Sequence, residues 1–295
     1  MKKRYKLNHR RREAITGFLF ISPWILGFLM FMMYPIYFSL KMSFSKVYIT
    51  TNGVDTQPIG FDNYKYAFLS DPDFVEKLLN FIKFTVIAVP IIVIFALFVA
   101  LLINQPIRFR GVFRAIFFLP VVITSGEVMN ELFSQGAASL PMLNKYGIIN
   151  FIRMSLSPAW AGPIINIMQQ FILILWYSGV QILIFLAGLQ KVNKQTFEAA
   201  AIDGASPWEM FWKIILPVVK PFILINIIYS IIDIFVYTSN DVIIMIKDNM
   251  FKVATGYGYA SALAWIYFSI IFVILIIVLL IFSRKEEYFK IEKNG

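Results

Sequence analysis

Long apolar stretches recur along this chain and restrict its fold more than any other feature. A helix needs about 20 predominantly apolar residues to cross the hydrocarbon core of a bilayer, and hydrophobic residues make up 59% of this chain against 15% charged residues. Because lipid offers no partners to backbone groups, each stretch is expected to satisfy its own hydrogen bonds as an α-helix. We therefore predict an all-α integral membrane protein with six transmembrane helices, at residues 14–40, 84–103, 115 onward, 164–189, 221–238 and 259–283.

The distribution of lysine and arginine orients these helices, because cytoplasmic loops carry an excess of basic residues. With both termini in the cytoplasm, 18 of the 27 Lys and Arg lie inside and 9 lie outside. The apolar stretch behind the basic N-terminus is too long for a signal peptide. The predicted organisation is a basic cytoplasmic tail at 1–13, a six-span domain at 14–283 with a cytoplasmic loop at 191–220, and a cytoplasmic C-terminal tail at 284–295.

Several kinds of chemistry are excluded by composition. The chain has no cysteine and only one histidine, His9 in the basic tail, so it lacks the residues for a thiolate nucleophile, a His-rich zinc site or a Ser-His-Asp triad at its centre. No Gly-rich loop of the P-loop pattern occurs, so the chain is not expected to bind ATP itself. The net charge of +10 is interpreted as contact with anionic lipid, and not with nucleic acid. We predict a non-enzymatic protein that binds no cofactor or metal.

The predicted cytoplasmic loop contains two short helices joined by a glycine turn. Asn193 is a plausible N-cap for a first helix over residues 194–203, and Gly204 stands where a positive φ is needed after a helix end. Ser206, Pro207 and Glu209 form the sequence pattern of a capping box with proline at the first helical position. A short, rigid element in a loop is suited to being held by a partner, and we call residues 193–217 the elbow.

The elbow sequence resembles the EAA loop found in permease subunits of binding-protein-dependent ABC importers. In that family the loop is the coupling helix and docks in a cleft of the ATPase subunit. The resemblance implies that this chain contacts a separate ATPase through a set of residues that fall on or beside the motif: Glu198, Ala199, Ala200, Asp203, Gly204, Ala205, Ser206, Pro207, Leu216 and Pro217.

Other stretches resemble the same family over nearly the whole chain. Phe20 to Trp24 and Tyr34-Pro35 are similar to the first span of carbohydrate permeases of the maltose and glycerol-phosphate class. Importers of that class contain two unlike permeases, and the similarity is to the first of them. The resemblance implies a type I importer architecture in a bacterial cell membrane. It also implies the following partners: a second, different permease, two copies of an ABC ATPase that binds ATP and Mg, and an extracellular substrate-binding protein. One departure is the lack of the Gly-Gly-Pro that family members often carry after the fifth span, which weakens any borrowed substrate assignment.

Polar residues inside predicted spans are candidates for the substrate path, because such groups are costly in lipid unless they face a cavity. Aromatic rings, amides and one acid suit a sugar or oligosaccharide. The alternatives are that the tyrosines form an interfacial belt, that Asp233 bonds a neighbouring helix and that Glu127 lies at a solvated helix end. The candidates are Glu127, Gln169, Tyr177, Tyr229, Asp233 and Tyr237.

A second functional hypothesis is an ion-coupled secondary transporter with Asp233 and Glu127 at a proton or sodium site. Such transporters usually show inverted repeats and matched broken helices, which this sequence does not display. The elbow would also have no role in such a protein. A membrane-embedded enzyme is a third reading, disfavoured by the missing nucleophile and metal constellations.

Overall fold

The structure is a computed structural model that describes residues 9–51, 53–105, 111–112, 115–117, 147–157, 161, 165, 168, 171–237, 240–252 and 255–293. The chain divides into two compact units. Unit 1 comprises Met1–Val75 and Met245–Tyr267, and unit 2 comprises Glu76–Ile244 and Phe268–Gly295.

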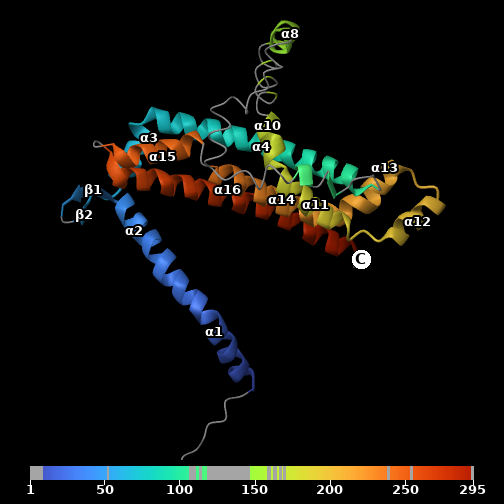
Figure 1. The fold of residues 1–295 in the computed structure, drawn as a ribbon, viewed down its shortest axis with the longest axis horizontal. Helices are drawn as coiled ribbons and strands as arrows, with labels where there is room; N and C mark the ends of the chain where they lie inside the picture. The colour runs from blue at the N-terminus through green and yellow to red at the C-terminus, as the bar shows by residue number, and fades with distance from the viewer. Residues whose placement is uncertain are drawn as a thin grey trace, which may run out of the picture. The chain divides into compact units, whose positions relative to one another are not determined.

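Unit 1 begins with a long apolar helical run. Helix α1 (His9–Phe28) passes through a π-helical segment, η1 (Leu29–Met33), into α2 (Tyr34–Ser43) (Figure 1). Pro35 lies in the first turn of α2, two residues after the end of the π-helical segment at Met33. Because proline lacks a backbone N–H, a local change in the hydrogen-bond ladder at this point accommodates it.

The all-α prediction is wrong between the first two long helices. Strands β1 (Ser45–Thr50) and β2 (Gly53–Pro58) form an antiparallel hairpin in which Ser45 pairs with Pro58 and Thr50 with Gly53. The sequence signal was present, because Val47 to Thr50 are good strand formers and Asn52-Gly53 is a hairpin dipeptide. Helix α3 (Asp62–Leu69) follows the hairpin.

Helix α4 (Pro72–Asn104) begins earlier than the span predicted from Phe84. The backbone N–H of Phe74 donates to Oδ1 of Asp71 at 3.1 Å, so Asp71 caps the helix and Pro72 takes its first position. The other carboxylate oxygen of Asp71 accepts a hydrogen bond from the hydroxyl of Tyr259 at 2.6 Å. This side chain therefore ties the start of α4 to helix α16 (Gly256–Lys293) within unit 1.

The remaining helices lie mainly in unit 2. They are α8 (Ile148–Ser155), α10 (Phe171–Tyr177), α11 (Gly179–Leu189), α12 (Lys194–Ile202), α13 (Pro207–Met210), the π-helical η2 (Phe211–Ile215) and α14 (Leu216–Val236), and α15 (Asp241–Phe251) crosses into unit 1. Residues 239–258 connect the predicted fifth and sixth spans, and α15 occupies part of that segment. Helix α16 also continues beyond residue 283, where the C-terminal tail was predicted to start.

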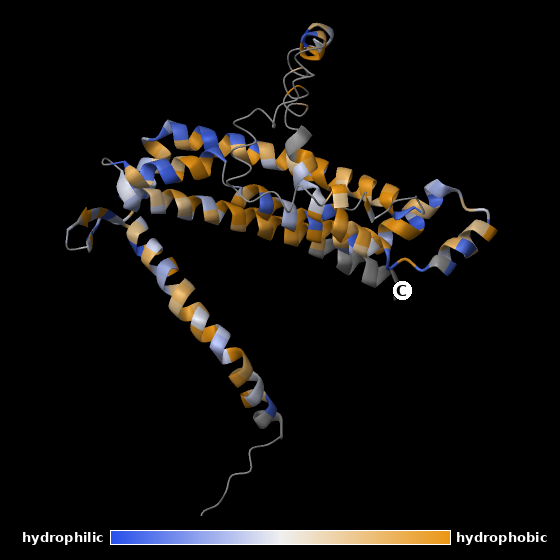
Figure 2. Ribbon diagram, in the orientation of Figure 1, coloured by the Kyte–Doolittle hydropathy of each residue, from blue (hydrophilic) through white to orange (hydrophobic). Residues whose placement is uncertain are grey.

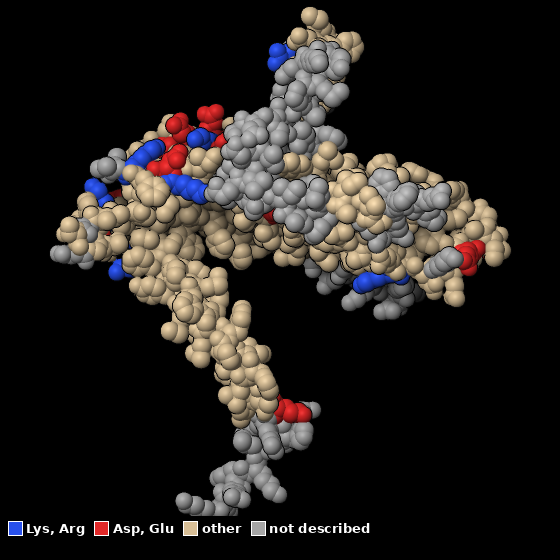
Figure 3. Space-filling model, viewed as in Figure 1, with Lys and Arg blue, Asp and Glu red and all other residues tan. Residues whose placement is uncertain are grey.

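Within the described residues, four helical runs are long and apolar enough to cross a membrane. They are Glu13–Ser43, Pro72–Asn104, Pro207–Phe251 and Gly256–Phe282, with Gly179–Leu189 as a shorter apolar helix. Hydrophobic residues dominate α4, α14 and α16 (Figure 2), and on the face drawn in Figure 3 the charged side chains gather toward the start of α4 and on the elbow. Most of the predicted third span lies outside the described residues, so six spans stays a prediction.

Candidate functional site

The elbow folds as its sequence predicts. The side chain of Asn193 accepts a hydrogen bond from the backbone N–H of Gln195 at 2.9 Å and caps α12. The N-cap Asn193 satisfies one of the backbone donors that the first turn of every helix leaves open. Asp203 is the C-cap, so the helix proper ends at Ile202, one residue before the predicted end.

A Schellman motif ends α12. Gly204 has φ +78°, and its backbone N–H donates to the carbonyl of Ala201 at 3.2 Å. The N–H of Ala205 reaches back to the carbonyl of Ala200 at 2.9 Å. These two bonds satisfy the terminal carbonyls, and the positive φ makes glycine the residue with the smallest conformational cost at this position.

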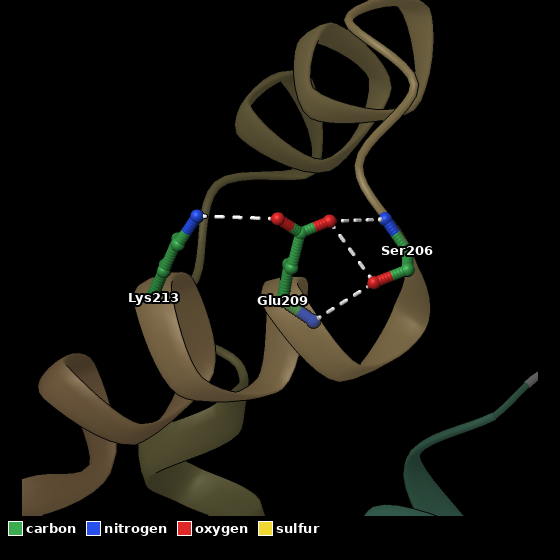
Figure 4. A network of polar contacts seen from close by, with 3 residues as sticks. All are labelled: Ser206, Glu209 and Lys213. Atoms are coloured by element: carbon green, nitrogen blue, oxygen red, sulfur yellow. Dashed lines mark hydrogen bonds and ion pairs between the residues drawn. The ribbon is translucent and has the colours of Figure 1, made fainter.

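A capping box starts α13 directly after this turn (Figure 4). The N–H of Glu209 donates to Oγ of Ser206 at 3.3 Å, while the Glu209 carboxylate accepts from the N–H and the hydroxyl of Ser206, each at 3.0 Å. The other carboxylate oxygen of Glu209 forms an ion pair with Lys213 at 3.2 Å. The Ser206 N–H, the Ser206 hydroxyl and then Lys213 lower the pKa of Glu209, which lies in the elbow ahead of α14. Glu209 is therefore ionised at neutral pH, and the capping box weakens only as the pH falls through that lowered pKa.

Helices α11 and α14 carry the two ends of the elbow and pack against each other (Figure 1). The amide of Gln181 on α11 donates to Oγ of Ser230 on α14 at 2.9 Å, and both side chains are buried. Closer to the elbow, Gly188 faces Phe222, and a Cβ on this glycine would lie 2.8 Å from the ring. The ammonium of Lys191 lies 5.0 Å from the centre of the same ring. These contacts hold α11 and α14 together at the two ends of the elbow.

The predicted coupling residues lie together on the elbow and are mostly exposed. Glu198 and Ala199 are exposed on α12, the turn exposes Asp203 and Gly204, and Ala200 and Ala205 are half-buried. Ser206 and Pro207 are exposed at the start of α13, while Leu216 is half-buried and Pro217 exposed at the start of α14. Most of the motif is thus accessible, and its role in docking stays a prediction.

Part of the predicted substrate path also comes together. The rings of Tyr177 and Tyr237 meet edge to face with centroids 5.7 Å apart. Tyr229 and Asp233 are one turn apart on α14, but Tyr237 caps the end of that helix instead of continuing it. Glu127 and Gln169 lie outside the described residues.

Buried polar side chains extend this group beyond the predicted residues. Gln181, Asn226 and Ser230 are buried where α11 meets α14, and none of the three is among the predicted path residues. Within the described part of the chain, Oε1 of Gln181 and Oδ1 of Asn226 accept no hydrogen bond. The sequence could have revealed these residues, because each is a polar residue inside an apolar span. Helical spacing also relates four residues of the fifth span: Asn226, Ser230, Asp233 and Tyr237.

A separate cavity of about 350 Å³ lies among α4, α14 and α16 in unit 2. Apart from Thr85 its lining is apolar, which does not match a solute rich in hydroxyl groups. The lining residues are Thr85, Val86, Val89, Pro90, Val93, Ile94, Ile227, Ile231, Ile274 and Val278.

These features define a class of protein: a helical, multi-pass membrane protein with a capped, exposed elbow carried by two packed helices. The chain belongs to the family of binding-protein-dependent transport system inner membrane components, which matches it over residues 67–285. That range includes the elbow and all of its predicted coupling residues.

Curated relatives cover most of the chain. The probable ABC transporter permease protein YesP of Bacillus subtilis (strain 168) is 30% identical over 94% of this chain and 92% of its own length. The lactose transport system permease protein LacF of Rhizobium radiobacter is 33% identical over 76% of this chain and 74% of its own. The arabinooligosaccharides transport system permease protein AraP of Bacillus subtilis (strain 168) is 30% identical over 92% of this chain and 87% of its own length.

A solved structure shares the fold. A chain of a bacterial alginate ABC transporter, solved in complex with an alginate pentasaccharide-bound periplasmic protein, superposes with a TM-score of 0.67. The two chains are 19% identical, and the match covers 92% of this chain and 96% of the other. This likeness confirms the permease fold, and the relatives are transport permeases, in keeping with a subunit that transports without catalysing a reaction.

Proposed function

We propose that this chain is one transmembrane subunit of an ATP-driven importer and forms part of the path for a sugar or oligosaccharide. The observation that carries the proposal is the elbow, where an N-cap, a Schellman turn and a capping box fix two short helices in an exposed loop between α11 and α14. A rigid loop of this kind transmits a movement from whatever grips it to the helices that carry it. A separate ATPase, which binds ATP and Mg, is the partner that family membership favours.

The substrate class rests on the relatives and on side-chain chemistry. Named relatives are permeases for lactose and arabinooligosaccharides, and the related structure holds a periplasmic protein bound to an alginate pentasaccharide. In this chain, Tyr177, Tyr229, Asp233 and Tyr237 offer aromatic faces and a hydroxyl acceptor on or beside α14. We assign the extracellular delivery of substrate to a binding protein, and the other half of the path to a second permease.

Transport is then a change between two packings of the helices. Closure of two ATPase subunits on ATP would move the elbows, and a loaded binding protein would bias the opposite side. This chain performs no covalent step. Its residues couple, line the path and hold the helices together in the bacterial cell membrane, with both termini in the cytoplasm.

The direct test is the dependence of uptake on the ATPase. Cells that express the permeases and the binding protein are assayed for uptake of labelled oligosaccharides, with the ATPase intact or with its phosphate-binding lysine replaced. Uptake only with the intact ATPase supports the proposal. Uptake that survives loss of the ATPase and stops when the ion gradient is collapsed would instead establish the ion-coupled alternative.

A further inference from the structure

The contact between α11 and α14 buries two amide oxygens that accept no hydrogen bond from the described residues. Gln181 and Asn226 are fully buried, and Ser230 is 1% exposed. The amide nitrogen of Gln181 donates to Oγ of Ser230 at 2.9 Å, and that of Asn226 donates to the carbonyl of Phe222 at 2.9 Å. Oε1 of Gln181 and Oδ1 of Asn226 are left over. Because nearly all buried polar groups in folded proteins are bonded, both oxygens require a donor.

Three polar side chains converge at this point of the contact. The amide oxygen of Gln181 belongs to the same planar group as the nitrogen that bonds Ser230, so it lies beside that hydroxyl. Asn226 precedes Ser230 by one turn of α14, and side chains one turn apart have Cβ atoms about 5–6 Å from each other. Two hydrogen bonds of about 2.8 Å each span such a separation. A small molecule between the two turns is therefore within hydrogen-bond reach of all three side chains.

The number of donors and acceptors limits what this molecule can be. Both amide oxygens need a donor, while the hydroxyl of Ser230, which accepts from Gln181, still has its own O–H to donate. Ca²⁺ and Mg²⁺ take about six or more oxygen ligands, so two amides and one hydroxyl are too few. An apolar ligand would leave both oxygens without a bond. Water donates twice and also accepts, and it alone among these satisfies the three groups.

We propose that one buried water molecule binds between α11 and α14. It donates its two hydrogens to Oε1 of Gln181 and Oδ1 of Asn226 and accepts from the hydroxyl of Ser230. These three bonds are the usual number for a buried water. Every side-chain nitrogen and oxygen of the three residues then has at least one partner.

The water gives the two helices a second kind of contact. Near the elbow, Gly188 packs directly against the ring of Phe222, so the helices meet there without polar groups between them. Ser230 lies eight residues beyond Phe222, about 12 Å further along α14. The helices that carry the elbow are thus joined by a dry contact close to it and by a hydrated contact deeper in the span.

Unfolding midpoints of the full chain in detergent test whether the two oxygens share a ligand. Gln181→Met and Asn226→Leu each keep the branching of the side chain and remove one acceptor. Each single variant should lower the midpoint by about 2–4 °C, because the water loses one of its partners. The double variant expels the water, and its larger apolar groups fill the roughly 30 Å³ released. Its midpoint should return to within about 2 °C of the wild type.

Gln190→Met is the matched control, because this amide is exposed at the C-cap of α11 and its replacement should not move the midpoint. A contact without water has no space for the larger side chains, so overpacking would place the double variant below both single variants. That order would overturn the proposal. A rise of the midpoint in either single variant would overturn it too, since removal of an unbonded acceptor would then be favourable.

A structure of the complete chain in its membrane complex, at a resolution that shows ordered waters, locates the ligand directly. We expect a density peak within about 3.2 Å of both Oε1 of Gln181 and Oδ1 of Asn226. If either oxygen accepts instead from another segment of the chain or from a partner subunit, or if no peak lies between them, the water site is overturned. Neither measurement depends on the proposed transport function.

Discussion

At the scale of single residues, Gly204 is the position on which the elbow depends most. Its φ of +78° is a conformation that β-branched residues adopt only with strain on the order of 1–3 kcal/mol. Open space surrounds the position, since a Cβ there would meet no atom within 4 Å. Gly204→Val should therefore leave membrane insertion intact, change the angle between α12 and α13, and sharply reduce ATPase retention at the membrane and substrate-stimulated hydrolysis.

Gly204→Asn is the matched control, because asparagine tolerates this backbone region better than other side chains. It should keep most of the coupling. Ser206→Ala should act in the same direction as Gly204→Val but mildly, since loss of an N-cap costs about 1 kcal/mol. Normal coupling in Gly204→Val would mean that the ATPase does not dock on the elbow.

Asp233 is the residue whose charge matters most to the proposed path. It is half-buried on α14, one turn from Tyr229 and near the buried Ser230. Asp233→Asn preserves the shape and removes the carboxylate that would accept hydroxyl hydrogen bonds. We expect sugar uptake to fall several-fold while the amount of assembled protein stays constant, as measured by transport per purified complex. If the protein is lost from the membrane and transport per molecule is unchanged, Asp233 is a packing residue. Ile232→Val, on the exposed neighbouring position, is the control.

At the scale of elements, local signals were readable from the sequence and long-range ones were not. The elbow was predictable because caps, the glycine turn and the capping box each involve residues within a few positions, as Asn193, Gly204 and Ser206 show. The contact between Gln181 and Ser230 joins residues 49 apart, and nothing in either local sequence identifies the partner. The apolar stretches predicted long helices, but the start of α4 was set by the cap at Asp71, outside the apolar window.

The hairpin of β1 and β2 shows a different limit. Its strand formers occupy only six residues each, too few to stand out beside spans of more than 20 residues. The bond from the Asn63 amide on α3 to the carbonyl of Ser45 at 3.1 Å supports the hairpin, as does the contact between the rings of Phe44 and Phe61, which flank it. An isolated two-stranded hairpin is only marginally stable, so the neighbouring contacts decide whether the strands form.

The base of the elbow gives a prediction at the same scale. In Gly188→Ala the new methyl group would lie 2.8 Å from Cγ and Cδ2 of Phe222, and these ring atoms cannot move without shifting the ring as a whole. Overpacking of this kind typically costs about 1–3 kcal/mol. We expect a lower unfolding midpoint in detergent and weaker coupling of hydrolysis to substrate.

The double variant Gly188→Ala/Phe222→Leu removes the obstructing ring and should recover most of the lost stability. Gly27→Ala is the matched control, because a Cβ at that helical glycine meets nothing within 4 Å. An unchanged midpoint in Gly188→Ala would show that α11 and α14 yield at this contact without cost, and that it does not brace the elbow.

At the scale of the whole molecule, one chain supplies only part of a transporter. It offers one elbow, and the mechanism proposed above needs two ATPase subunits closing on each other, hence a second elbow from another permease. In the helical run Glu13–Ser43, the most apolar stretch of 18 residues contains no buried residue, so its surface is open to lipid or to another chain. The first-span sequence Phe20 to Trp24 resembles the first of two unlike permeases in carbohydrate importers.

We therefore expect a hetero-oligomer. Affinity purification of the tagged chain, with its genomic neighbours co-expressed, should return one different permease, two copies of an ATPase and, when substrate is present, one binding protein. Mass measurement of the intact complex gives the copy numbers, and Gly204→Val should lose the ATPase while retaining the second permease, because helix–helix contacts in the membrane do not involve the elbow. Recovery of a dimer of this chain with itself would contradict the unlike pairing. A complex that keeps its ATPase in Gly204→Val would move the docking surface away from the elbow, and the coupling role assigned to Glu198 through Pro217 would then belong to another loop.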